Sequence, residues 1–240
     1  MATDARMIDI EALSTRRVLV IAPHPDDEAL GCGGLLARLA HRGGRVHVVF
    51  VTDGGASHPR SQHWPRARLA AQRELEAAEA LRRLGLAAQD RSFLRLSDAA
   101  MPPLETPDGA TALSTLTAIV QSFEPDLVLL PWRRDPHCDH RDAWALTQAA
   151  LKRTGLTPMQ LEYAVWLDEF GEPDDRPVPG EAERVGFDIS DVTPIKRAAV
   201  AAHLSQTTDL INDDPAAFRL TAQTIDRLTG PVEHYWRALR

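Results

Sequence analysis

The chain has 240 residues, of which 44% are hydrophobic and 25% are charged, a composition typical of a soluble globular protein. Its net charge is −7 and it has no sustained basic run, which argues against nucleic acid as a partner. No stretch approaches the roughly 18 consecutive apolar residues of a transmembrane helix, and the N-terminus lacks the apolar segment of a signal peptide. The two cysteines, Cys32 and Cys138, are too few for a disulfide framework, so we expect a cytoplasmic protein without a membrane span.

Apolar runs and helix-period patterns alternate along the chain after a short polar lead-in over residues 1–15. Strands are expected at 18–22, 45–52, 91–96, 126–131, 160–167 and 184–189. Helices are expected at 29–42, 66–84, 111–123, 141–154, 193–204 and 215–228. This alternation predicts an α/β fold with a mostly parallel sheet and helices on both of its faces. Because no repeat, low-complexity tract or linker interrupts the pattern, we expect one domain over residues 1–240.

The turn that follows the first strand carries one imidazole and three carboxylates, at His24, Asp26, Asp27 and Glu28. In an open α/β sheet, ligands bind at the carboxyl ends of the strands, and imidazole and carboxylate are both zinc ligands. Capping of the next helix explains one acidic residue, or two. It does not explain His24. We therefore predict a metal at this turn, with one carboxylate left free to act as a general base.

A second polar loop follows the strand expected at 126–131. It contains Asp135, His137, Asp139 and His140 within six positions. Both loops open on the same edge of a parallel sheet, so they can meet and hold one metal ion between them. Zinc suits these ligands, and iron or cobalt would be accepted as well. We do not expect the thiol of Cys138 to be a ligand.

These motifs resemble those of the LmbE-like or PIG-L-like zinc-dependent de-N-acetylases. The resemblance rests on Ala22-Pro-His-Pro-Asp-Asp-Glu28, Thr52-Asp-Gly-Gly55, Arg73 with Glu76 before Leu84-Gly85, Asp135-Pro-His-Cys-Asp-His140, and Lys196-Arg-Ala-Ala with Ala202-His-Leu-Ser-Gln206. The landmarks run from residue 18 to about residue 206, which is most of the chain. The acidic and histidine motifs in this order are specific, and the later ones are weaker.

The resemblance implies a Rossmann-like sheet and a zinc ion held by two histidines and one aspartate: His24, Asp27 and His140. Asp26 matches the general base of the family. His137 matches a histidine that stabilises the oxyanion or protonates the leaving amine, and Asp139 would orient it. Cys138 stands where the family more often has proline, a position without a functional group, so the implied roles survive this departure.

Substrate contacts are expected from several further residues. Arg73 matches an arginine of the family that supports the site or the substrate. Trp132 and Arg133 are candidates because they immediately precede the second metal motif. His203 is a candidate near the C-terminus, with packing or helix capping as the alternative. Lys196 is expected on a solvated face.

The function implied by the resemblance is that of a zinc-dependent hydrolase acting on an amino sugar or an N-acetylglucosaminyl conjugate. It would release acetate and a free amine. The residues by themselves support only metal-assisted hydrolysis. Two alternatives stay open: an amidase that cleaves a thiol-conjugate amide, and a non-catalytic, metal-stabilised domain that binds a carbohydrate or a partner. The loops at 53–65 and 97–109 are expected to set the specificity for this small-molecule substrate.

Overall fold

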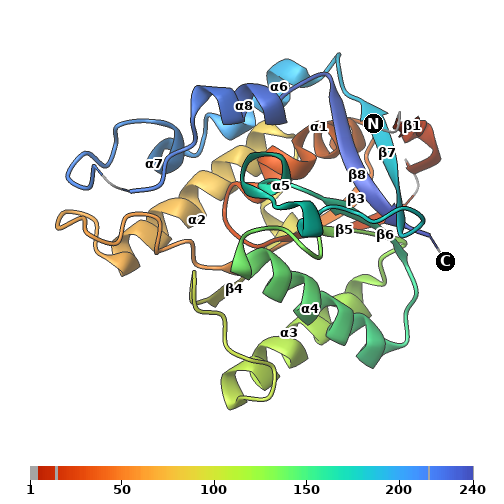
Figure 1. Cartoon of the computed structure of the whole chain (residues 1–240), viewed down its shortest axis with the longest axis horizontal. Helices are drawn as coiled ribbons and strands as arrows, with labels where there is room; N and C mark the ends of the chain where they lie inside the picture. Colours follow the sequence, from red (N-terminus) through yellow and green to blue (C-terminus); the bar gives the residue numbers. More distant parts are fainter. Residues whose placement is uncertain (1–4, 14–15, 216, 240) are drawn as a thin grey trace.

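The computed structural model describes residues 5–13, 16–215 and 217–239, so the expected lead-in lies partly outside the described residues. Within them, eight strands form one sheet in the order β1-β7-β8-β6-β5-β2-β3-β4 (Figure 1). The strands are β1 (Arg6–Met7), β2 (Arg17–Ala22), β3 (Arg45–Thr52), β4 (Arg91–Leu96), β5 (Leu127–Pro131), β6 (Met159–Tyr163), β7 (Ala182–Asp188) and β8 (Val232–Ala238). The α-helices are α1 (Asp27–His41), α2 (Arg66–Arg83), α3 (Pro107–Phe123), α4 (Cys138–Thr154), α5 (Leu167–Phe170), α6 (Thr193–Val200), α7 (Leu204–Thr207) and α8 (Ala222–Leu228). Short 3-10 turns lie at Ile10–Leu13, Ala88–Asp90 and Pro173–Asp175.

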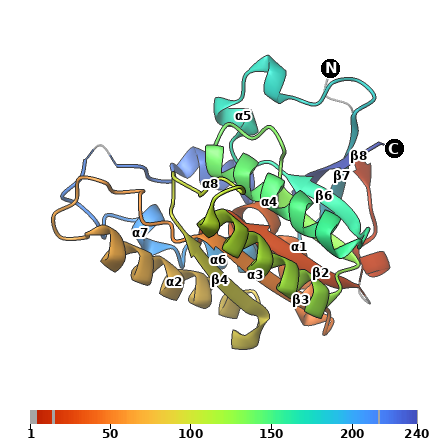
Figure 2. The same cartoon turned by 90° about the horizontal axis from the view of Figure 1, so that it is seen from below.

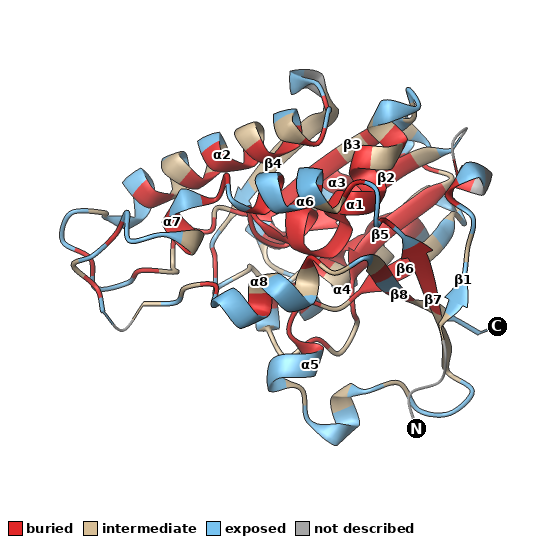
Figure 3. Cartoon of the chain, turned by 90° about the horizontal axis from the view of Figure 1, so that it is seen from above, coloured by how far each residue is buried: buried red, intermediate tan, exposed pale blue. Residues whose placement is uncertain are grey.

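Helices cover both faces of the sheet. Helices α3 and α4 pack together on one face, whereas α1, α2 and α6 pack over the other (Figures 1 and 2). Each face has its own apolar core because successive side chains of a strand point in opposite directions. Along β2, Val18 and Val20 enter one core, and Leu19 and Ile21 enter the other. Figure 3 shows that buried residues fill the central strands and α1.

The expected α/β fold with a mostly parallel sheet is confirmed. Strands β2, β3, β4, β5 and β6 are paired in parallel, and β1 is parallel to β7. The departure is β8, which runs antiparallel to both β6 and β7. This strand was not expected from the sequence, because a glutamate, Glu233, occupies one of its buried positions and interrupts the apolar alternation.

Several boundaries differ from the expected ones. Helix α4 begins at Cys138, so the second metal motif ends inside a helix and not in a loop. The start of the helix expected at 215–228 includes residue 216, which lies outside the described residues. Residues 217–221 are not helical, because the amides of Phe218 and Leu220 donate to the carbonyls of Ser57 and Gln206 at 3.1 and 2.9 Å. Helix α8 therefore starts only after Thr221, whose hydroxyl accepts from the amide of the third helical residue. No helix in the described part of the chain is long and apolar enough to cross a membrane.

Candidate active site

The two polar motifs meet at one edge of the sheet. Strands β2 and β5 are parallel neighbours, so the turns that follow them lie side by side. Asp26 is the N-cap residue of α1 and His137 is the N-cap residue of α4. The start of each helix therefore presents its motif to the other. The sequence expectation that the two loops face each other corresponds to this arrangement.

The three expected metal ligands converge on one carboxylate oxygen. Oδ2 of Asp27 lies 3.2 Å from Nδ1 of His24 and 3.3 Å from Nε2 of His140. All three side chains are buried. Spacing alone also allows His137 to share a metal with the two histidines. However, Nδ1 of His137 accepts from the backbone amide of Asp139 at 3.2 Å. The ring proton is then on Nε2, which leaves no lone pair on that nitrogen for a metal.

Each of the two converging histidines has a carboxylate on its far nitrogen. Nε2 of His24 lies 3.0 Å from Oδ2 of Asp139, and Nδ1 of His140 lies 3.4 Å from Oδ1 of Asp135. Metal-bound histidines almost always have such a second partner, which sets the tautomer and the orientation of the ring. The carboxylate of Asp139 thus contacts His24, whereas its contact with His137 is made by its backbone amide.

Charge and hydrogen bonding in this cluster fit a divalent cation. Neither ring nitrogen of the buried His140 has a hydrogen bond among the described residues. Burial opposes protonation of His140, but Asp27 and Asp135 outweigh it and raise its pKa to about 10. For His24 burial is likewise outweighed, by Asp139, Asp27 and Asp98, which raise its pKa well above the usual value. Without a metal these carboxylates thus need two imidazolium charges, and two imidazoles with one carboxylate are a common zinc ligand set.

Asp26 lies next to the cluster and has the properties of a general base. Its Oδ2 accepts from Nη2 of Arg73 at 3.0 Å, and Arg73 also donates to the carbonyls of Pro25 and Gly54. Burial raises the pKa of Asp26 to about 6, against the lowering effect of the Arg73 charge. A carboxylate with a pKa just below neutrality is ionised at pH 7 and still accepts a proton readily.

His137 contacts the rings of both converging histidines. Its ring is 4.7 Å from that of His24, in an edge-on arrangement. Burial and the charges of His24 and His140 lower its pKa to about 4, so the ring is neutral near pH 7. Because Nδ1 accepts from the Asp139 amide, the ring proton resides on Nε2. A neutral imidazole with this tautomer can donate to an oxyanion.

The cluster opens into a cavity of about 520 Å³ whose outer wall is apolar. Trp166, Phe170 and Phe218 line this wall, and the Trp166 and Phe218 rings meet edge to face at 5.3 Å. The expected specificity loops also line the cavity: Ala56, Ser57 and Pro59 from one, and Asp98 and Ala99 from the other. Sequence analysis missed the aromatic wall, because its members come from segments far from either metal motif.

Of the expected substrate-binding residues, only Arg73 lines this cavity. Trp132 is fully buried and its indole donates to the carbonyl of Asp175 at 2.7 Å. Arg133 is held by the carboxylate of Glu162. His203 is fully buried, with Nε2 at 3.0 Å from Oε1 of Glu28. These three side chains support the surrounding structure and do not line the cavity.

The positions of two further residues were not predicted from the sequence. Asp98 was not singled out, yet its Oδ1 lies 3.3 Å from Nε2 of His24. Its signal was a carboxylate two residues after the carboxyl end of β4, a third strand of the parallel sheet. Lys196 was expected on a solvated face, which is wrong: it is 1% exposed and its Nζ donates to Oε1 of Glu233 at 2.6 Å. The sequence pattern around Lys196 contains no information about its partner Glu233, which is buried on a distant strand.

The chain is similar in sequence to known deacetylases. A family profile described as "PIG-L: GlcNAc-PI de-N-acetylase" matches residues 19–151. The 1D-myo-inositol 2-acetamido-2-deoxy-alpha-D-glucopyranoside deacetylase of Mycobacteroides abscessus is 28% identical, over 93% of this chain and 92% of that protein.

Two solved structures extend the comparison. The N,N'-diacetylchitobiose deacetylase of Pyrococcus horikoshii superimposes with a TM-score of 0.62 at 26% identity, over 84% of this chain and 75% of that one. The 4-carboxy-2-hydroxymuconate hydratase of Pseudomonas putida KT2440 also has a TM-score of 0.62, at 24% identity, over 78% of each chain. At that identity the second likeness concerns the fold alone. Because a hydratase shares the fold, the assignment of a reaction depends on the site residues.

Proposed function

Because this chain belongs to the PIG-L family, we propose that it is a metal-dependent N-deacetylase that removes an acetyl group from an amino sugar or an N-acetylglucosaminyl conjugate. The observation that carries the proposal is the position of the buried, Arg73-bound carboxylate of Asp26 beside the convergent His24, Asp27 and His140. A binding domain needs neither a base nor an oxyanion donor. Acetate and a free amine are the expected products.

The proposed ligands are His24, Asp27 and His140, and zinc is the proposed metal, with iron or cobalt as alternatives. A divalent cation bound there supplies Lewis-acid polarisation of the acyl carbonyl and lowers the pKa of a water molecule toward about 7. Asp139 and Asp135 orient the two histidines from behind. A cytoplasmic location also remains a proposal, supported by the small number of cysteines.

The protein side chains then handle the protons. Asp26 accepts a proton from the attacking water while the Arg73 guanidinium keeps the carboxylate in place. Nε2–H of His137 donates to the carbonyl oxygen as negative charge develops on it, which is a large stabilising effect in a buried site. When the carbon–nitrogen bond breaks, protonated Asp26 returns the proton to the leaving amine. One water is consumed, and the products are a free amine and acetic acid, which loses its proton to become acetate.

The test is a metal-loaded screen of N-acetylated glycosides and glycoconjugates that measures the free amine. Asp26→Asn should keep the metal content, because Asp26 is not a proposed ligand, and should lower kcat by about 10²- to 10⁴-fold. Asp108→Asn, an exposed acidic residue in the first turn of α3, is the matched control. Substantial turnover by metal-loaded Asp26→Asn would refute the base assignment. Amine release from thiol-conjugate amides alone would favour an amidase. If no substrate releases an amine, a non-catalytic domain would be favoured.

A further inference from the structure

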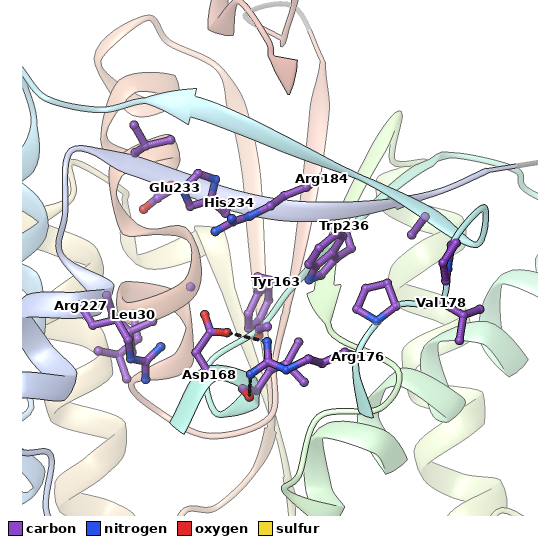
Figure 4. Close-up of a pocket in the computed structure, with 18 of the residues that line it drawn as sticks. Leu30, Tyr163, Asp168, Arg176, Val178, Arg184, Arg227, Glu233, His234 and Trp236 are labelled. Carbon is purple, nitrogen blue, oxygen red and sulfur yellow. Dashed lines mark hydrogen bonds and ion pairs between the residues drawn. The ribbon is translucent and has the colours of Figure 1, made fainter. Parts of the chain in front are cut away.

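A second, larger cavity is lined by residues of β7 and β8, of helices α1 and α8 and of segment 176–180. It has a volume of about 910 Å³, and none of the residues that line it lines the catalytic cavity. It forms where β8 separates from β6. Among the described residues these two strands are paired only at Glu162 and Trp236, whereas β7 and β8 are paired along all of Ala182–Asp188. Segment 176–180 closes one side, and residues of α1 and α8 close the other (Figure 4).

The charges around this cavity do not balance. Four lysine and arginine side chains line it among the described residues. Three of them are matched by a carboxylate: Arg176 by Asp168, Arg227 by Glu169 and Lys196 by Glu233, at nitrogen–oxygen distances of 3.1, 3.0 and 2.6 Å. The fourth is Arg184, whose guanidinium has no hydrogen bond or ion pair within the described ranges. One positive charge is thus left over, in a chain whose net charge is −7.

Arg184 lies between two ring side chains. It is directly opposite Trp236 in the β7–β8 pairing, and His234 is two positions from Trp236 on the same strand, so all three side chains project from one face. In Figure 4 the Arg184 side chain extends beside His234, across the cavity from the ion pair of Arg176 and Asp168. Burial, followed by the charge of Arg184, lowers the pKa of His234.

We propose that this cavity binds a small organic anion, whose carboxylate or phosphate group is held by Arg184. A guanidinium presents donors in a planar fork that matches both groups. The indole of Trp236 and the apolar side chains of Val178 and Leu30 line the space for the body of the ligand. The volume is in the range of small-molecule sites. This site is separate from the proposed deacetylase centre and does not depend on that function.

The experiment is isothermal titration calorimetry of the full, metal-loaded chain with benzoate and with inorganic phosphate. Comparison of the two probes shows whether the site prefers a carboxylate or a phosphate group. Arg184→Gln should weaken binding of the preferred probe by about tenfold or more, the usual effect of losing a charged hydrogen bond. Arg237→Gln is the matched control, because it makes the same change in charge on β8 but its side chain binds Glu183 outside the cavity. A bound anion should also raise the pKa of His234, which proton NMR can follow with His234→Gln for assignment.

The outcomes are distinct. Loss of binding in Arg184→Gln, with binding kept in Arg237→Gln and in His24→Ala, supports the site. Binding that persists in Arg184→Gln but disappears in His24→Ala places the anion at the catalytic centre and overturns the proposal. Failure of the unchanged chain to bind either probe overturns it as well. Circular dichroism and the melting temperature of Arg184→Gln show whether the variant is folded.

Discussion

Asp26 is held in a backbone conformation that residues with a side chain rarely adopt. Its φ is 145° and its ψ is −27°. Such a conformation costs about 1–3 kcal/mol and persists only where the surroundings impose it. Here the backbone amide of Asp26 donates to Oε2 of Glu28, its carbonyl accepts from the amide of Leu30, and its carboxylate binds Arg73. The start of α1 and one arginine thus hold the base in a strained position.

We expect Asp26→Gly to be more stable than Asp26→Ala by about 1 kcal/mol, although both should lose turnover. Glycine adopts a positive φ without steric cost, and this gain exceeds the entropy that glycine loses on folding. Urea unfolding measures the difference. At the exposed helical Asp108 the order should reverse, because alanine is favoured over glycine in a helix. Equal stability of the two Asp26 variants would contradict the strain.

At the scale of elements, the outer wall of the catalytic cavity joins two connections that are distant in sequence. Trp166 precedes α5, and Phe218 lies in the segment between α7 and α8. The amide of Phe218 donates to the carbonyl of Ser57, which ties that segment to the loop after β3. Phe218 is 39% exposed and Phe170 58%, so both remain accessible to a substrate. Aromatic faces at this position suit the apolar face of a sugar or an apolar group attached to it.

Phe218→Ser should therefore raise KM more for a substrate with an apolar group on the sugar than for the free N-acetylated sugar. We expect a two- to tenfold effect, roughly the value of one aromatic contact. The comparison of KM for a matched pair of glycosides measures it. Leu75→Ser, which removes an exposed apolar side chain from α2, should not change KM for either substrate. An equal rise in KM for both substrates would show that the wall contacts only the sugar.

Glu181, in the segment between α5 and β7, forms an ion pair with Arg134. Both carboxylate oxygens of Glu181 accept from Arg134 at 2.6 Å, and one of them also accepts from the amide of Val178. The hydrogen bonds from Arg134 lower the pKa of Glu181 from 4.5 to about 2. A carboxylate with a lowered pKa stabilises the fold above its unfolded pKa, and this contribution is lost as the pH falls through the folded pKa.

Glu181→Gln should accordingly be less stable than the unchanged chain at pH 7, and the difference should shrink as the pH falls from about 4.5 toward 2. Urea unfolding at a series of pH values measures this. Glu105→Gln, at an exposed position before α3, serves as the control and should have little effect at any pH. A stability difference independent of pH would mean that Glu181 acts through packing and not through its charge.

At the scale of the whole molecule, one buried carboxylate connects three elements. Glu233 on β8 accepts from the amides of Gly34 and Leu35 in α1 and from Nζ of Lys196 in α6. The hydroxyl of Tyr235 donates to it as well. Because a buried charge needs this many partners, the C-terminal strand is placed by the helix that begins at the active site.

Lys196→Met should destabilise the chain by about 3–5 kcal/mol, because it leaves Glu233 charged and buried without its cation. The double variant Lys196→Met with Glu233→Leu should recover much of the loss, since both charges are then absent. Urea unfolding of the parent, both single variants and the double variant gives the coupling. A double variant less stable than Lys196→Met would contradict this account.

Local patterns predicted much of this molecule. The strand at 18–22 and the helix after it follow from an apolar run and helical periodicity, which act between near neighbours. The pairing of the two polar motifs follows from parallel topology, because such strands end at a common edge. The long-range contacts were not predictable in this way. Lys196 reads as a surface residue because its partner lies 37 positions later, on a strand that the buried Glu233 disguises.

The sequence by itself determined the α/β class, the parallel strands β2 and β5 and the candidate ligands and base that follow them. These depend on periodicity and on residues within one turn of each other. Only the tertiary structure showed that Asp139 contacts His24, that Asp98 approaches the same ring, and that Trp132, Arg133 and His203 lie away from the cavity. It also determined the aromatic wall and the second cavity. The physical reason is that side-chain direction and burial depend on packing between segments far apart in the chain, which no local pattern encodes.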